Sequence, residues 1–118
     1  SDFRDLSAAT KAGNERAALA RELFCYKVKQ YIGAYAASLG GVDAIVLTAG
    51  VGENDPFIRE MILEGLEYLG MDMDYDYNKA CPRGKEVEIS KPTSKVHVYV
   101  IPTDEEMTIA HDTAALAL

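Results

Sequence analysis

The stretch VDAIVLTAGVGENDPFIREMI, residues 42–62, decides how the chain is organised. Its short apolar run, residues 44–47, is rich in β-branched side chains and predicts a buried strand. A turn containing Gly50 and Gly52 comes next. The NDP segment, residues 54–56, predicts a helix start, because a capping side chain precedes a proline near the first helical position. A strand, a glycine turn and a helix N-terminus in this order commonly bring backbone amides against a ligand.

The same pattern also fits an ordinary β–α connection, whose turn needs glycine for geometry alone. Two well-known phosphate-binding motifs are excluded by their residues. A P-loop requires Lys followed by Ser or Thr after its last glycine, whereas Glu53 and Asn54 follow Gly52 here. A dinucleotide-binding fingerprint requires a third glycine, and Asp55 occupies that position.

Composition limits the class of protein. The 118 residues are 48% hydrophobic and 26% charged, which suits one domain or part of one. The formal net charge of −7 argues against nucleic acid or an anionic membrane as a partner. An anionic ligand such as a nucleotide therefore needs a local cation, most simply Mg²⁺. The first residue is Ser1, and the opening SDFRD does not resemble a natural start, so we expect a piece of a longer or processed protein.

Local sequence also bears on the state of the cysteines and on a transmembrane segment. Cys25 and Cys81 have no metal-ligand spacing, which favours reduced thiols in a cytosolic protein. Residues 31–52 are largely apolar and long enough to cross a bilayer. Asp43 and the Gly40-Gly41 pair interrupt that stretch, and its second half is strand-like. We therefore predict no transmembrane helix and no nucleic-acid or membrane partner.

The first part of the chain predicts mainly helix. Residues ~5–11 are expected to form a short helical turn, and the Lys11–Asn14 segment a break. A long helix follows over ~15–38 and ends at Gly40-Gly41. Apolar residues recur along it at steps of three and four and predict one stripe for the core or a subunit interface. The stripe consists of Ala20, Phe24, Val28, Tyr31, Ile32 and Tyr35.

After the opening stretch, a helix is expected over ~56–69, with Gly70 at the position of a C-terminal cap. Its inward residues are Ile58, Met61, Ile62, Leu66 and Leu69. Residues 71–84 are expected to be irregular and 85–89 to form a partly exposed strand. Residues 96–101 predict a strong strand with its valines on one face. His97 shares the other face and is interpreted as a pleat residue that pairs across the strand.

The final helix is expected over ~104–116, because Thr103 and Glu106 form a capping box. Acidic residues are normal in a first helical turn, yet the 104–106 cluster also follows a strand end. In a parallel α/β sheet, ligand sites gather at strand C-termini. The 50–54 turn and the Glu105 cluster are therefore predicted to face one cleft, with a ligand at the first and hydrated Mg²⁺ at the second. No nucleophile or general base is apparent.

Several segments together resemble a known family. They are SDFRD at 1–5, GGVDAIVLTAG and TAGVGEND within 40–55, IREMILEGLEYLG at 58–70, RGKEVEIS at 83–90, HVYVIPT at 97–103 and the acidic cluster at 104–106. In this order and spacing they resemble the C-terminal region of the acetate kinases over nearly the whole chain.

The resemblance implies an α/β fold of the ribonuclease H-like (actin-like ATPase) type, of which residues 1–118 are the C-terminal, nucleotide-side portion, a mixed sheet packed by long helices. It implies phosphoryl transfer between ATP and acetate, giving acetyl phosphate and ADP, with Mg²⁺ as cofactor. It also implies a cytoplasmic homodimer whose C-terminal domain takes part in dimer contact.

The resemblance also assigns residues. Nucleotide-binding positions are Asp2, Phe3, Arg4, Gly50, Val51, Gly52, Glu53 and Asn54, and the Mg²⁺ ligand is Glu105. The chain departs from the family at Asp104, Met107 and His111, where the family usually has Asn, Leu and Arg. An extra carboxylate at Asp104 changes the local charge around the metal.

The family's acetate-binding arginines, catalytic aspartate, transition-state histidine and phosphate loop lie before Ser1 in sequence. We therefore place no catalytic residue in this chain, expect acetate to be bound by the absent N-terminal half, and expect the fragment alone to be inactive. Two alternatives stay open. One is a propionate or butyrate kinase fragment, since the acceptor pocket lies outside these residues. The other is a non-catalytic dimerisation or binding module, which the striped helix suits.

Overall fold

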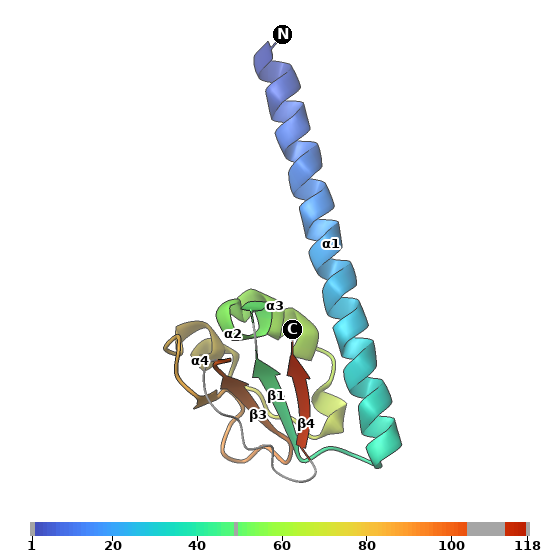
Figure 1. The fold of residues 1–118 in the computed structure, drawn as a ribbon, viewed down its shortest axis with the longest axis vertical. Coiled ribbons are helices and arrows are strands. Elements are labelled where there is room, and N and C mark those ends of the chain that lie inside the picture. The colour runs from blue at the N-terminus through green and yellow to red at the C-terminus, as the bar shows by residue number, and fades with distance from the viewer. Residues whose placement is uncertain (1, 49, 104–112, 118) are drawn as a thin grey trace.

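The computed structural model describes residues 2–48, 50–103 and 113–117. It shows an α/β arrangement in which helices pack on a small mixed sheet (Figure 1). The order of elements is α1 (Asp2–Leu39), β1 (Ala44–Thr48), α2 (Gly50–Asn54), α3 (Pro56–Leu63), η1 (Glu67–Leu69), α4 (Tyr75–Ala80), β2 (Val87–Glu88), β3 (His97–Ile101) and β4 (Thr113–Ala117).

Helix α1 is one continuous helix of 38 residues, so the predicted break at Lys11–Asn14 is wrong. An interior glycine costs a helix about 1 kcal/mol, which the flanking helix formers offset here. Gly40 and Gly41 end the helix as predicted, with φ angles of 74° and 130° that favour glycine. At 1.5 Å per residue the helix is ~57 Å long, so it accounts for the longest dimension of the molecule, 59 Å.

The predicted stripe on α1 is only partly correct. Val28 and Ile32 are buried, together with Cys25, whose thiol is free. Tyr31 and Tyr35 are 59% and 53% exposed, so the aromatic part of the stripe is not core. The N-terminal turns of α1 project beyond the sheet and the shorter helices (Figure 1). The radius of gyration is accordingly 16.6 Å, against ~13.5 Å for a compact domain of this length.

The sheet has the strand order β2-β3-β1-β4. Strands β3 and β4 run parallel to β1, and β2 runs antiparallel to β3, which confirms a mixed sheet. The valines of β3, Val98 and Val100, face the core, and His97 and Tyr99 face the other side, as their alternation predicts. Residues 113–117 form strand β4, so the part of the predicted final helix that reached this segment is wrong. The rest of that helix lies outside the described residues.

The helix after the glycine segment is shorter than predicted. Helix α3 ends at Leu63 rather than near residue 69, because Gly65 adopts a φ of 93°. A separate 3₁₀ turn, η1, follows, and Gly70 is its left-handed cap. Met61 is 37% exposed, contrary to its predicted inward position.

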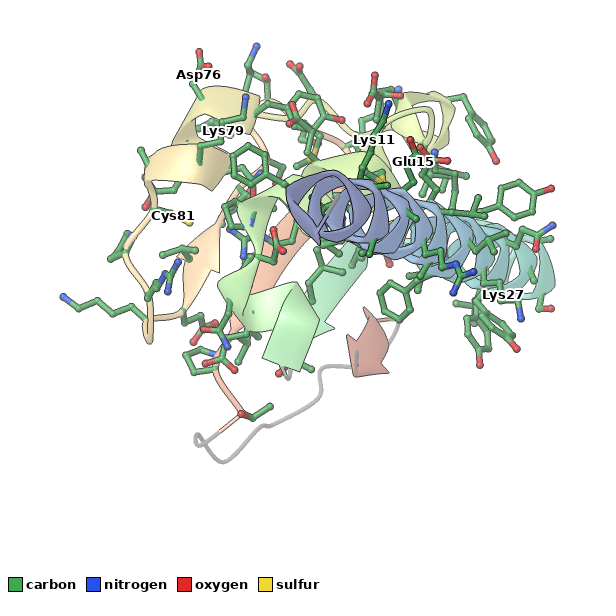
Figure 2. The ribbon with its side chains drawn as sticks, turned by 90° about the horizontal axis from the view of Figure 1, so that it is seen from above. Lys11, Glu15, Lys27, Asp76, Lys79 and Cys81 are labelled. Atoms are coloured by element: carbon green, nitrogen blue, oxygen red, sulfur yellow. The ribbon has the colours of Figure 1, made fainter. Side chains whose placement is uncertain are left out.

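The segment 71–84, predicted to be irregular, contains helix α4. Asp74 caps that helix by accepting a hydrogen bond from the Tyr77 amide at 2.9 Å. In Figure 2, Lys79 and Cys81 of the α4 region lie on the opposite side of the molecule from Lys27 on α1. Both thiols are free, as expected for reduced cysteines.

The core lies between one face of the sheet and the helices α1 and α3. Its largest fully buried side chains include Ile45 and Leu47 of β1 and Ile62 and Leu63 of α3. The parallel pairing of β1 with β3, in which Thr48 lies opposite Ile101, places the C-terminal ends of these strands next to each other. Among the described helices, none is long and apolar enough to cross a membrane.

Candidate functional site

The predicted glycine turn is a five-residue helix, α2, that starts two residues after β1 ends. Gly50 has a φ of 39°, which a side chain at that position would disfavour. The Asn54 side-chain amide donates to the Gly50 carbonyl at 3.0 Å and so closes the segment on itself. The prediction of a turn is therefore corrected to a single helical turn, which presents Gly50 and Asn54 on its exposed side.

A surface cavity of ≈ 570 Å³ lies against this turn. That volume falls in the usual range for small-molecule sites, ~300–1,000 Å³. Its lining residues are Gly50, Asn54, Asp55, Pro56, Phe57 and Arg83. Two of them are sequence-predicted nucleotide contacts, while Phe57 and Arg83 were not predicted. Phe57 is 67% exposed, which leaves an aromatic face available to a ligand.

The start of α3 confirms the predicted cap. The Asp55 carboxylate accepts hydrogen bonds from the amides of Phe57 at 3.0 Å and Ile58 at 3.2 Å, and Pro56 occupies the first turn. These amides are therefore already paired. An anion at this end of α3 cannot use them without displacing Asp55.

Glu53 connects the two halves of the predicted site. Its Oε2 atom accepts hydrogen bonds from the Thr103 backbone amide and from the Thr103 hydroxyl, both at 3.2 Å. Thr103 directly precedes the acidic cluster 104–106. The structure thus brings the α2 turn and the chain leading into that cluster to the same edge of the sheet, where the parallel strands β1 and β3 end.

Other predicted site residues are not brought to this edge. Asp2, Phe3 and Arg4 lie in the first turn of α1, which projects away from α2 (Figure 1). The backbone of Val51 is part of α2. Glu105 lies outside the described residues. Within the ranges 2–48 and 50–103, no group of three His, Cys, Asp or Glu residues could hold a metal ion.

Sequence reasoning missed a buried arginine beside the turn. Arg59 of α3 is 3% exposed, and its guanidinium reaches α2 on one side and α4 on the other. Nη1 donates to the carbonyls of Gly52 at 3.3 Å and Glu53 at 3.0 Å. Nε donates to Asn78 Oδ1 at 2.7 Å, and Nη2 donates to the Asn78 carbonyl at 2.9 Å.

The spacing of apolar residues contains a signal for this burial. Arg59 lies three residues before Ile62 and four before Leu63, both fully buried, so it shares their helix face. Burial lowers the pKa of the Arg59 guanidinium, and the nearby Cys81 and Asp55 raise it. The group stays charged at neutral pH because the ordinary arginine pKa is so high.

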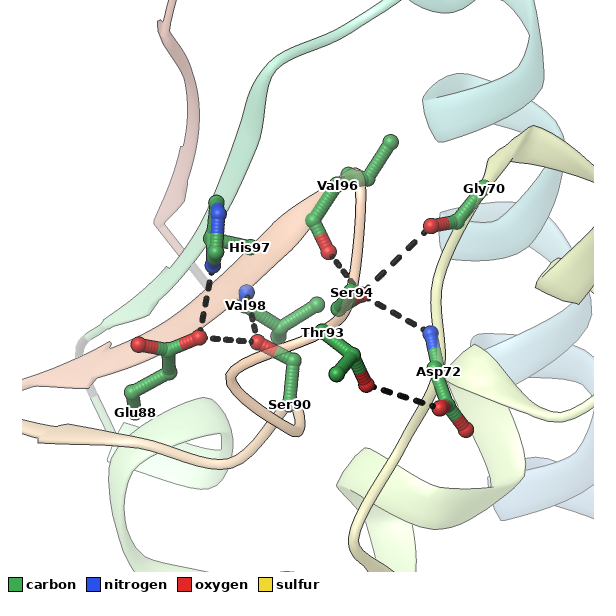
Figure 3. A network of polar contacts seen from close by, with 9 residues as sticks. All are labelled: Gly70, Asp72, Glu88, Ser90, Thr93, Ser94, Val96, His97 and Val98. Atoms are coloured by element: carbon green, nitrogen blue, oxygen red, sulfur yellow. Dashed lines mark hydrogen bonds and ion pairs between the residues drawn. The ribbon is translucent and has the colours of Figure 1, made fainter.

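A second polar network joins Glu88 of β2, Ser90 and His97 of β3 (Figure 3). His97 Nδ1 is 2.7 Å from Glu88 Oε2, as expected for a residue that pairs across the strand. The Ser90 hydroxyl donates to the same Glu88 oxygen at 2.7 Å and accepts from the Val98 amide at 2.9 Å. Because the Ser90 proton goes to Glu88 and not to His97, this is no nucleophile–base pair. Burial raises the pKa of Glu88, but hydrogen bonds from His97 and Ser90 outweigh it and leave the pKa below its ordinary value.

Comparison with known proteins identifies the family of this arrangement. The sequence profile of the Acetokinase family matches residues 1–111. An acetate kinase from Caldicellulosiruptor saccharolyticus is 56% identical over 116 residues, which are 98% of this chain and 29% of that protein. The chain therefore spans less than a third of the length of this curated relative.

Solved structures agree. An acetate kinase from Porphyromonas gingivalis superposes with a TM-score of 0.73 at 50% identity, over 86% of this chain and 25% of that one. A propionate kinase from Francisella tularensis gives a TM-score of 0.64 at 32% identity, over 86% and 25% of the two chains. The chain, with its α2 turn at the end of β1, belongs to the acetokinase family.

Proposed function

We propose that these residues are the C-terminal, nucleotide-side portion of an acetate kinase, which transfers a phosphoryl group between ATP and acetate. The observation that carries the proposal is the 56% identity to a curated acetate kinase over 98% of the chain. In this proposal the portion belongs to a ribonuclease H-like ATPase fold, and the N-terminal half lies in a longer protein.

The cavity beside α2 supports a nucleotide role for this portion. Gly50 and Asn54 line it, and glycine lets the backbone lie close to a ligand. We assign the adenosine and inner-phosphate end of ATP to the 50–54 segment, with the transferring phosphate nearer the N-terminal half. Arg83 at the rim adds a cation to a chain of net charge −7, which otherwise repels a nucleotide.

Mg²⁺ is assigned to Glu105, by family resemblance and by the chemistry of the donor set. Three successive carboxylates at 104–106 are hard oxygen ligands of the kind that Mg²⁺ prefers, directly or through water. The bound ion would neutralise charge on the transferring phosphate. The bond between Glu53 and Thr103 holds the chain entering that cluster against the nucleotide turn.

Asp2, Phe3 and Arg4 remain part of the proposed nucleotide site. For them to reach it, the first turns of α1 must bend toward α2. Gly13 is the weakest point of that helix, because glycine is the poorest helix former other than proline and nothing lies within 4 Å of its side-chain position.

We also propose a cytoplasmic homodimer. Its support on this chain is the exposed aromatic surface of α1, where Tyr26, Tyr31 and Tyr35 are 60%, 59% and 53% exposed. Aromatic residues are enriched in subunit interfaces. Sedimentation of the full-length protein tests this, and a strict monomer at high concentration contradicts it.

Activity is tested in the full-length protein with ATP, Mg²⁺ and acetate, with acetyl phosphate trapped by hydroxylamine. We expect turnover there and none from the 118 residues alone. Glu105→Ala should lower the Mg²⁺-dependent rate by at least about 100-fold, the scale for losing one catalytic electrostatic group. Normal kinetics in that variant would remove Glu105 from the site.

A propionate kinase is the second candidate, favoured by the Francisella tularensis structure at 32% identity. The acceptor pocket lies outside these residues, so the choice of carboxylate is decided by comparing kcat/KM for acetate, propionate and butyrate. A full-length protein that binds nucleotide but transfers no phosphoryl group to any of the three would instead support a non-catalytic binding module.

A further inference from the structure

Arg59 occupies an unusual environment for a cation. It is 3% exposed, and the ion pairs found among the described residues do not include it. A buried charge without a counter-ion is costly unless its donors are all hydrogen-bonded. Backbone carbonyls and one amide side chain therefore take the role that a carboxylate would normally have.

The carbonyls that Arg59 binds come from helix ends. Gly52 and Glu53 belong to the last turn of α2, and Asn78 belongs to the last turn of α4. Carbonyls at a helix C-terminus lack intrahelical partners and carry the negative end of the helix dipole. The guanidinium thus caps two short helices at once and joins them through a single side chain.

The helix α2 depends on such support. It has five residues, two of them glycine, and an isolated helix of that length does not form in water. Two other side-chain tethers hold it, the Asn54 bond to Gly50 and the Glu53 bond to Thr103, and both are exposed. Arg59 supplies the buried tether.

Arg59 lines a small cavity of ≈ 60 Å³ among α2, α3, α4 and the 81–85 segment, which is too small for a nucleotide. The lining of the ≈ 570 Å³ cavity on the exposed side of the turn includes Gly50 and Asn54 but not Arg59. The two cavities share Asn54, Pro56 and Arg83, so Arg59 supports the turn beside the larger cavity without lining it.

We propose that Arg59 is a positioning residue for nucleotide binding: through the carbonyls of Gly52 and Glu53 it holds α2 in the conformation that receives the nucleotide. This inference rests on the proposed function, because it requires the α2 turn to bind ATP. A turn that must be ordered by the ligand itself binds more weakly, since the ordering cost is subtracted from the affinity. Loss of Arg59 should accordingly affect nucleotide affinity more than the chemical step.

The test uses the full-length enzyme and the variant Arg59→Lys, which keeps the charge but lacks the planar fork that reaches several carbonyls. We expect the KM for ATP to rise about tenfold, with kcat and the KM for acetate within about twofold of wild type. A residue that only stabilises the fold would lower the fraction of active enzyme, and so the apparent kcat, while the folded remainder kept its KM.

A second variant tests the inference independently, in case Arg59→Lys does not fold. Asn78→Ala removes the Oδ1 acceptor at 2.7 Å from Arg59 Nε but leaves Arg59 itself in place. We expect a smaller rise in the KM for ATP, about threefold, and faster amide hydrogen exchange in the peptide covering Gly50–Asn54. If Arg59→Lys does not fold, Asn78→Ala alone decides the question.

Lys79→Ala is the matched control. Lys79 also joins α4 to α3, through an exposed ion pair with Glu60 at 3.7 Å, and within the described part of the chain it forms no ion pair with α2. Its KM for ATP should stay at the wild-type value. An unchanged KM for ATP in a folded Arg59→Lys or Asn78→Ala enzyme would overturn the inference. A wild-type enzyme that does not use ATP would refute the proposed function instead.

Discussion

Replacing Gly70 by alanine should destabilise this fold more than the same change at other left-handed glycines. Gly70 has a φ of 114°, and a Cβ built on it would lie 3.3 Å from Lys95 Cβ and 3.3 Å from Val96 Cγ2. The Gly70 carbonyl also accepts hydrogen bonds from the amides of Lys95 and Val96, both at 3.0 Å. A shift that relieves the contact therefore disturbs the entry into β3.

The cost has two parts. A side chain in a left-handed conformation costs about 1–2 kcal/mol. Displacing two packed neighbours adds a term of the same size as mild overpacking, ~1 kcal/mol. We expect Gly70→Ala to lower the free energy of unfolding by ~2–3 kcal/mol in total.

Gly40 provides the control, because its φ is 74° and nothing lies within 4 Å of its side-chain position. Gly40→Ala should cost the conformational part alone, ~1–2 kcal/mol. Urea unfolding followed by circular dichroism measures both variants, with the slope against urea checked for constancy. Equal losses in the two variants would refute the close-contact argument, and no loss in either would refute the argument from backbone strain.

Three further outcomes are expected. Leu63→Ala should lower the free energy of unfolding by ~2–5 kcal/mol, since Leu63 is 0% exposed and its loss leaves a cavity; a urea midpoint within error of wild type would contradict this. Thr48→Val should raise stability by ~1 kcal/mol, because the buried Thr48 hydroxyl has no hydrogen-bond partner among the described residues; a loss of stability would show that the hydroxyl is paired. The Glu88–His97 contact should stabilise the fold fully above the unfolded pKa of Glu88, and this stabilisation should be lost as pH falls through the lowered folded pKa of Glu88. Glu88→Gln should therefore flatten the acid limb of a profile of unfolding free energy against pH. An unchanged acid limb in this variant would exclude the contact as the cause of the acid-side loss of stability.

Features that depend on adjacent residues were predictable from the sequence. The apolar run 44–47 is β1 but for its last residue, and Asp55 caps α3 as its position before Pro56 indicates. Gly40 and Gly41 end α1. In each case the chemistry that decides the structure lies within a few residues, so a local pattern contains it.

Features decided by distant partners were not predictable in the same way. Residues 113–117 are rich in alanine and suggest helix, but they pair with the edge of β1 that β3 leaves free. Residues 75–80 belong to the acidic, aromatic stretch 71–84 that was predicted to be irregular, yet they form α4. Its Asn78 is 1% exposed and donates to the Pro56 carbonyl of α3 at 2.9 Å. A neighbouring strand or helix supplies what the local sequence lacks.

The candidate site also combines features set by adjacent residues with features set by distant partners. The sequence predicts Gly50 and Asn54, which line the cavity beside α2, because glycine and asparagine in a turn after a strand are a local signal. It does not identify what holds that turn, because the partners of Arg59 lie 6, 7 and 19 residues away on separate helices. A cation on an apolar helix face is the available clue, since such a residue must find acceptors inside the fold. The residue that supports a binding turn can therefore be sought in a sequence as the charged side chain that shares a helix face with strongly apolar neighbours.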